Sequence, residues 1–177
     1  MAVIFIALAV ACSSDGGSAH ASDRGAGLRT ASLPAAQAAS AYAAALREAF
    51  DVGPGLALLI DPALLPRSRG SASTQRLAAG VVRGLRTRGV IQGNCQPRGG
   101  TKSLAPICPI STPGYVIRVS DIFEVARDTV QLYLTAERFR AARDSARFAP
   151  PLNMEQRYTL ARRGPRWAVA SKEQLVP

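Results

Sequence analysis

The sequence has little of the chemistry that hydrolytic, metal-dependent and nucleotide-dependent enzymes require. Its 177 residues include one histidine, His20, which precedes the region able to form a core. A Ser-His-Asp triad, a Cys-His pair or a histidine-based metal site therefore cannot form within the domain. The only lysines, Lys102 and Lys172, stand in no glycine-rich phosphate-binding motif. We assign no catalytic residue, metal or cofactor, and we favour a protein that is not an enzyme.

The sequence also has no long apolar run at its start. The run at residues 2–11 is shorter than the roughly 20 residues that a membrane-spanning helix needs, but it has the length of a signal-peptide core. The small residues Ala9-Val10-Ala11 come directly before Cys12. This pattern resembles the lipobox of bacterial lipoproteins. The resemblance implies that Cys12 becomes a lipidated N-terminus, and that Ser13 beside it favours the outer membrane.

Two alternatives to a lipid anchor stay open. Ala19-His20-Ala21 fits an ordinary secretory cleavage site, which would release a soluble protein beginning at Ser22. An uncleaved anchor, or a start upstream of Met1, is the other alternative. We favour lipidation of Cys12 because that site adjoins the apolar run. The expected location is the cell envelope, with the protein lipid-anchored and facing the periplasm or the exterior.

These signals divide the chain into three parts. We expect a signal peptide at residues 1–11, a flexible tether at 12–33 and one domain at 34–177. The tether is predicted from its density of Ser, Gly and Asp, a composition typical of flexible linkers. The remaining length suits a single compact domain.

Three cysteines are few, and export explains all of them. Once Cys12 is lipidated, Cys95 and Cys108 remain as a pair in an oxidising compartment, which predicts a disulfide. Closing a loop of this size contributes about 3 kcal/mol in the chain-entropy model. A metal site or a catalytic thiol is the weaker alternative, because the domain has no histidine to join either cysteine.

Positive charge is what the chain has in excess. Its formal net charge is +10, and the excess is almost entirely arginine. Arginine binds phosphate and carboxylate groups, so an anionic envelope component or a protein is the expected partner, beside the membrane itself through lipid on Cys12. Export disfavours nucleic acid. A GC-rich coding sequence, which enriches Ala, Arg, Gly and Pro, is the favoured explanation of the charge.

Two groups of arginines are local candidates for binding anions. The stretch at residues 137–151 combines phenylalanines with four arginines, Arg138, Arg140, Arg143 and Arg147. A surface loop whose phenylalanines dock on the sheet is the plainer interpretation. A second group lies off the apolar stripe of a predicted helix, where a solvated face is favoured over an anion site: Arg76, Arg83, Arg86 and Arg88.

The hydrophobic pattern predicts an α+β domain. One helix is expected over residues 35–50, with Tyr42, Leu46 and Phe50 on one face, and another from Ser71 or Ser73 to Arg88. Alternation predicts two hairpins, 115–123 with 129–135 and 154–163 with 167–171, and a buried strand at 56–60. The expected fold has two N-terminal helices packed on an antiparallel sheet of four or five strands.

Carboxylates offer the only general acid–base chemistry available. Asp61 follows a predicted strand, where an Asx turn is favoured over a functional role. Asp121, Glu124 and Asp128 cluster near the first hairpin turn, where we expect them to be solvated or paired with Arg118 and Arg127.

The second hairpin is similar to the closing strands of cone-shaped folds of the nuclear transport factor type. The resemblance implies a curved sheet with a ligand cavity. The alternative function is therefore binding of a small ligand, with simple carboxylate chemistry. A core filled by Leu132, Tyr158 and Trp167 would count against such a cavity.

Overall fold

The computed structural model describes residues 27–50, 56–67, 75–96, 108, 112–139 and 154–176. Within these ranges it has two helices, α1 (Ala35–Ala49) and α2 (Ala79–Thr87). All eight strands belong to one sheet: β1 (Arg29–Thr30), β2 (Ala57–Ile60), β3 (Gly93–Asn94), β4 (Gly114–Val119), β5 (Phe123–Ala126), β6 (Thr129–Phe139), β7 (Met154–Arg163) and β8 (Arg166–Val176).

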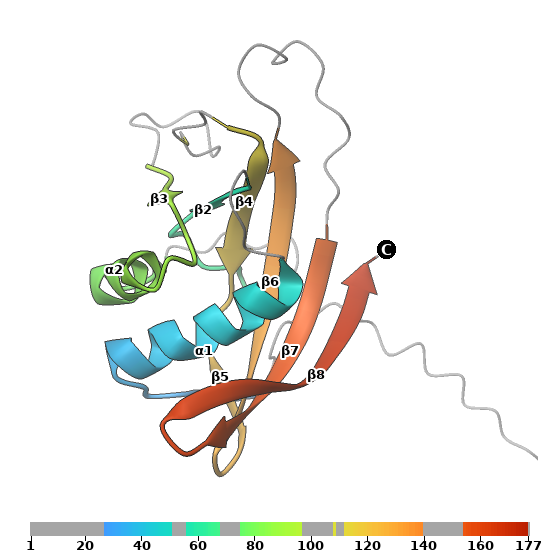
Figure 1. The fold of residues 1–177 in the computed structure, drawn as a ribbon. Coiled ribbons are helices and arrows are strands. Elements are labelled where there is room, and N and C mark those ends of the chain that lie inside the picture. Colours follow the sequence, from blue (N-terminus) through green and yellow to red (C-terminus); the bar gives the residue numbers. More distant parts are fainter. Residues whose placement is uncertain are drawn as a thin grey trace, which may run out of the picture.

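The sheet is built around β6, which runs through its middle (Figure 1). β7 and then β8 follow on one side of β6, while β4 and β5 share the other side, and all these pairings are antiparallel. β4 and β5 behave as one strand with a bulge, because Val119 pairs with Leu134 whereas Phe123 pairs with Gln131. One extra residue therefore lies between these pairs, which bends the strand.

The expected α+β class with an antiparallel sheet is wrong. Among the described residues, strand outweighs helix about two to one, and the sheet is mixed because β2 pairs in parallel with both β3 and β4. The predicted strand at 56–60 exists as β2. After β2 the chain passes through α2 before it forms β3. A helical crossover of this kind places the two strands parallel, whereas tight hairpins place them antiparallel.

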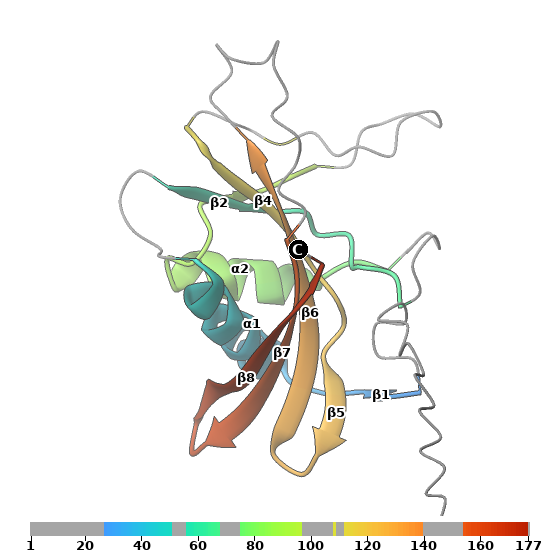
Figure 2. The same cartoon turned by 90° about the vertical axis from the view of Figure 1, so that its right-hand side faces the viewer.

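Both helices lie on one side of the sheet (Figure 2). α1 packs over β7 and β8, and α2 packs on α1. The predicted inner stripe of α1 is confirmed, because Tyr42, Leu46 and Phe50 are all buried. Alanine, which favours helix, makes up most of α1 and lets it lie close to its neighbours.

The second helix begins later than predicted. α2 starts at Ala79, and the candidate caps Ser71 and Ser73 lie outside the described residues. The segment before α2 is held extended, because the N–H of Leu77 donates to the Pro62 carbonyl at 2.8 Å. Its end is as predicted: Gly89 has a φ of +65°, a left-handed conformation that glycine adopts without strain.

The main core lies between α1 and the sheet. Leu132, Tyr158 and Trp167 are buried within it, as the alternation along their strands predicts. A smaller cluster on the opposite side consists of Leu65, Phe123 and Tyr133. The core is therefore filled where the resemblance to cone-shaped folds implies a cavity.

Candidate anion-binding groove

Most of the predicted anion-binding residues lie outside the described residues. These are Arg140, Arg143 and Arg147, and the same holds for Cys12. Arg138 is exposed on β6, where it pairs in register with Tyr115 of β4. The sulfur atoms of Cys95 and Cys108 are bonded, with the two Cα atoms 4.2 Å apart. Oxidation of this pair in the cell stays a prediction.

Asp61 has the structural role that the sequence favoured. Its Oδ1 accepts the N–H of Ala63 at 3.0 Å, which is an Asx turn. Its Oδ2 accepts Nε of Arg118 at 3.0 Å and also binds that residue's Nη2. The carboxylate is buried and fully engaged, so it is not available as a base. The predicted pairing of Arg118 with the hairpin acids is wrong, because the bent course of the chain brings Asp61 closer.

The three hairpin acids do not converge on one site. Glu124 binds Arg29, and Asp128 lies 3.9 Å from Nε of Arg127, so the latter pairing is confirmed. Asp121 lies at the bulge, where burial raises the pKa of its carboxyl and the nearby Arg67 opposes that rise.

Two buried tyrosines hold their protons. The hydroxyl of Tyr42 donates to the Ser120 carbonyl at 2.8 Å, and that of Tyr158 donates to Gln156. Burial raises the pKa of both phenols. Each hydroxyl is therefore a neutral structural donor at physiological pH.

A groove of about 680 Å³ runs along the outer side of α1, and we call it the α1 groove. Its floor is a stripe of α1 with short side chains that ends at an arginine: Ser40, Ala43, Ala44 and Arg47. Arg88, at the end of α2, forms one wall. The turn of the β7–β8 hairpin forms the other with Pro165, Arg166 and Trp167.

Close packing of the two helices places Arg88 beside α1. A Cβ added at Gly84 would lie 2.8 Å from Cβ of Ala39, and one at Gly80 would lie 3.2 Å from Cβ of Ala35. Only residues this small allow α2 to approach α1 so closely. Nη2 of Arg88 consequently reaches the Ala36 carbonyl of α1 at 3.3 Å.

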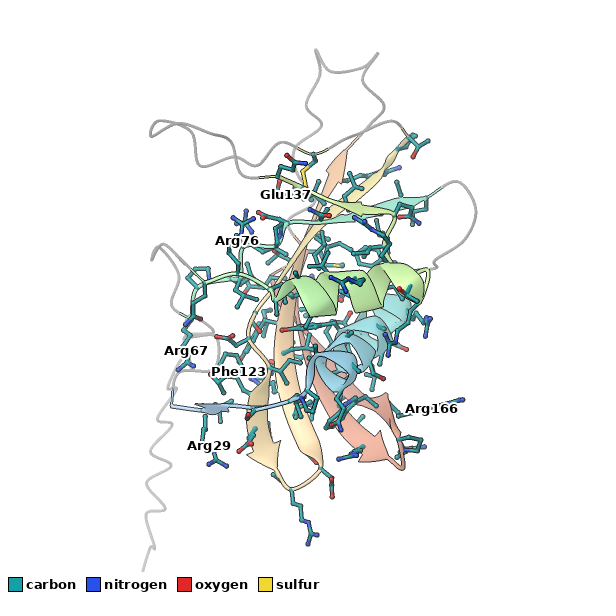
Figure 3. The ribbon with its side chains drawn as sticks, turned by 90° about the vertical axis from the view of Figure 1, so that its left-hand side faces the viewer. Arg29, Arg67, Arg76, Phe123, Glu137 and Arg166 are labelled. Atoms are coloured by element: carbon teal, nitrogen blue, oxygen red, sulfur yellow. A yellow bond between two sulfur atoms is a disulfide. The ribbon has the colours of Figure 1, made fainter. Side chains whose placement is uncertain are left out.

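Carbonyl oxygens orient two of the three arginines. Nη1 of Arg88 donates to the Gly84 carbonyl at 2.9 Å, and Nη2 of Arg47 donates to the Arg88 carbonyl at 3.1 Å. These carbonyls belong to the last turn of α2 and its C-cap, and the Gly84 carbonyl also accepts the backbone N–H of Arg88 at 3.3 Å. Arg166 extends outward from the β7–β8 hairpin (Figure 3). Throughout the described ranges, no carboxylate forms an ion pair with any of these three arginines.

A second groove, of about 550 Å³, lies between the N-terminal segment and the β5–β6 hairpin, and we call it the hairpin groove. It also borders Trp167, and it contains both acids and arginines. Its charged residues are Arg29, Glu124, Arg127, Asp128 and Arg162. Both acids form ion pairs with arginines of the groove, so much of its positive charge is neutralised.

Sequence reasoning found only part of the α1 groove. Of the arginines noted along the second helix, Arg88 lines it, whereas Arg86 donates to Oδ1 of Asn94 at 2.8 Å. Arg47 and Arg166 were missed: Arg47 stands alone in the sequence, and the position of Arg166 after a hairpin turn gave no sign that it would face α1. The pattern of short side chains at Ser40, Ala43 and Ala44 was an available signal for a hollow along α1.

Comparison with protein-family models, curated proteins and solved structures gives no significant match to this chain. Within the described part of the chain, no helix is long and apolar enough to cross a membrane. In the same ranges, His, Cys, Asp and Glu side chains form no group of three that could hold a metal ion. The interpretation of the site therefore rests on its own chemistry.

Proposed function

We propose that this chain is an exported lipoprotein of the cell envelope whose domain binds an anionic envelope component in the α1 groove. Lipid on Cys12 holds the protein at the membrane, with the outer membrane favoured by Ser13. The residues that precede β1 act as the tether, because Arg29 and Thr30 pair with β5 and belong to the domain. The domain binds its partner and catalyses no reaction.

The observation that carries this proposal is the unneutralised charge of the α1 groove. Arg47, Arg88 and Arg166 come from three separate elements and line one hollow that contains no described carboxylate. Guanidinium groups bind phosphate and carboxylate through paired N–H donors, and two of these are already oriented by helix carbonyls. A net charge of +10 adds attraction at longer range.

A small apolar ligand inside the curved sheet has less support. Leu132, Tyr158 and Trp167 occupy that space in the core. The two acids of the hairpin groove are paired with arginines, so carboxylate chemistry there would first have to break those pairs. Binding at the surface of α1 requires no such rearrangement.

Site-specific crosslinking in intact cells tests the proposal. A photoreactive residue at Ser40, in the floor of the α1 groove, should trap an anionic envelope component, while one at Arg83 on the exposed side of α2 should not. Cys12→Ala should release the protein from the membrane fraction, and the wild type should carry acyl chains by intact mass. Equal crosslinking at both positions would contradict groove binding, and a soluble wild type beginning at Ser22 would contradict the anchor.

A further inference from the structure

We infer that the ligand of the α1 groove is a linear chain bearing several phosphate groups, rather than a single small anion. This inference rests on the proposed function and specifies its ligand class. Three observations support it: the spacing of the arginines, the length of the groove, and the placement of guanidinium donors on both of its walls.

The spacing of Arg47 and Arg88 indicates more than one anionic group. Arg88 binds the Gly84 carbonyl, while Arg47 binds the carbonyl of Arg88 itself. These acceptors are four residues apart along α2, which corresponds to about 6 Å at the helical rise of about 1.5 Å per residue. Two guanidinium groups held by acceptors one helical turn apart offer donors to successive anionic groups of one chain.

Both arginines keep donors for a ligand. The hydrogen bonds to carbonyls use one N–H of Arg47 and two of Arg88, from the five that a guanidinium carries. The carbonyls bear partial charges only, so they orient the cations without neutralising them. Arg166 forms no ion pair with any described residue and can fold over a bound chain from the opposite wall.

The floor of the groove fits an extended ligand. From Ser40 to Arg47 the stripe on α1 covers about 10 Å at the helical rise of about 1.5 Å per residue. Its volume of about 680 Å³ lies in the range of pockets that hold organic ligands, and far exceeds what one inorganic anion fills. Ala43, Ala44 and Trp167 offer apolar surface to the parts of the chain between charges.

Phosphate suits the two walls better than carboxylate does. A planar carboxylate presents two oxygens toward a single guanidinium fork. A phosphate group carries acceptor oxygens that diverge in several directions. It can therefore accept from Arg88 on one wall and from Arg166 on the other, which no single carboxylate can do as well.

Titration of the full-length chain in detergent with short linear polyphosphate tests this inference. Calorimetry and the fluorescence of Trp167, the only tryptophan, report binding. Polyphosphate should bind about a hundredfold more tightly than orthophosphate, because joined groups add avidity. Arg47→Gln should weaken binding about tenfold, the effect of losing a charged hydrogen bond, and should lower the salt slope by about 0.7. Arg83→Gln, an exposed arginine of α2 that does not line the groove, is the matched control and should change neither.

Each of the following outcomes would overturn the inference. Orthophosphate binding as tightly as polyphosphate would indicate a single-anion site. Polyglutamate or anionic phospholipid vesicles binding more tightly than polyphosphate would assign the groove to carboxylate chains or to a membrane surface. Equal effects of Arg47→Gln and Arg83→Gln would indicate binding to net charge alone. If polyphosphate fails while Ser40 still crosslinks an anionic component, the ligand class is wrong and the proposed function stands.

Discussion

The two grooves on either side of Trp167 use the same cation in opposite ways. In the hairpin groove, Arg29 and Arg127 meet acids from neighbouring parts of one hairpin. In the α1 groove, Arg47 and Arg88 meet backbone carbonyls, which orient them and leave their charge in place. The same side chain is therefore neutralised by a carboxylate in one groove and only oriented by a carbonyl in the other.

The largest expected effect comes from removing the residue that both grooves share. Trp167 is buried in the main core as well as bordering each groove. Trp167→Ala should lower the free energy of unfolding by about 3–5 kcal/mol, the usual cost of emptying such a site. Urea unfolding followed by circular dichroism measures this. Val125→Ala, an exposed position of the hairpin groove alone, should change stability by less than about 0.5 kcal/mol. Equal losses from the two variants would show that Trp167 is not a core residue.

The disulfide separates stability from binding, because neither cysteine lines a groove. Replacing Cys95 and Cys108 by serine should lower the free energy of unfolding by about 3 kcal/mol, as the chain-entropy model predicts for a loop of this length. Affinity for polyphosphate should stay unchanged in the folded protein. Thiol labelling of denatured wild type should find both cysteines blocked until reductant is added. A parallel loss of affinity would mean that the crosslinked region supports the α1 groove.

Local patterns predicted the β-hairpins that border the hairpin groove, but not β1, because Arg29 and Thr30 were assigned to the tether. Side chains in a strand alternate with a period of two, so the inward faces of β6 and β7 followed from Val130, Leu132 and Tyr158. The sequence also indicated a turn at Arg127 and Asp128, whose pairing depends on adjacent residues. Short-range contacts of this kind leave a readable signal.

The α1 groove could not be predicted in the same way, because its walls come from distant parts of the chain. One wall follows α2, in the crossover between β2 and β3, and the other is the β7–β8 hairpin. Arg47, Arg88 and Arg166 are far apart in sequence, and no shared motif connects them. Their approach depends on the parallel return through α2 and on the fit of Gly84 against Ala39. The same crossover made the antiparallel fold class wrong.

Changing the fit between the helices should damage the α1 groove and spare the hairpin groove. A Cβ at Gly84 would lie 2.8 Å from Cβ of Ala39 and 3.1 Å from Nη1 of Arg88. Alanine gains about 1 kcal/mol of helix propensity, but overpacking costs about 1–3 kcal/mol, so Gly84→Ala should be destabilised by up to about 2 kcal/mol. Thermal unfolding and polyphosphate titration should both register the change. Gly80→Ala, with a looser contact to Ala35, should have the smaller effect; the reverse order would contradict this account of the helix packing.

Removing an acid from the hairpin groove tests the comparison of the two grooves most directly and should change stability least. Glu124→Gln removes the partner of Arg29, and exposed pairs of this kind contribute less than about 1 kcal/mol. If carboxylates prevent anions from binding in the hairpin groove, this variant should bind polyphosphate at a second site in calorimetric titrations, and that binding should weaken with salt. Glu173→Gln, which removes the acidic partner of Arg157 outside both grooves, is the matched control and should leave one site. A single site in both variants would mean that the shape of the α1 groove, more than its free charge, selects the ligand.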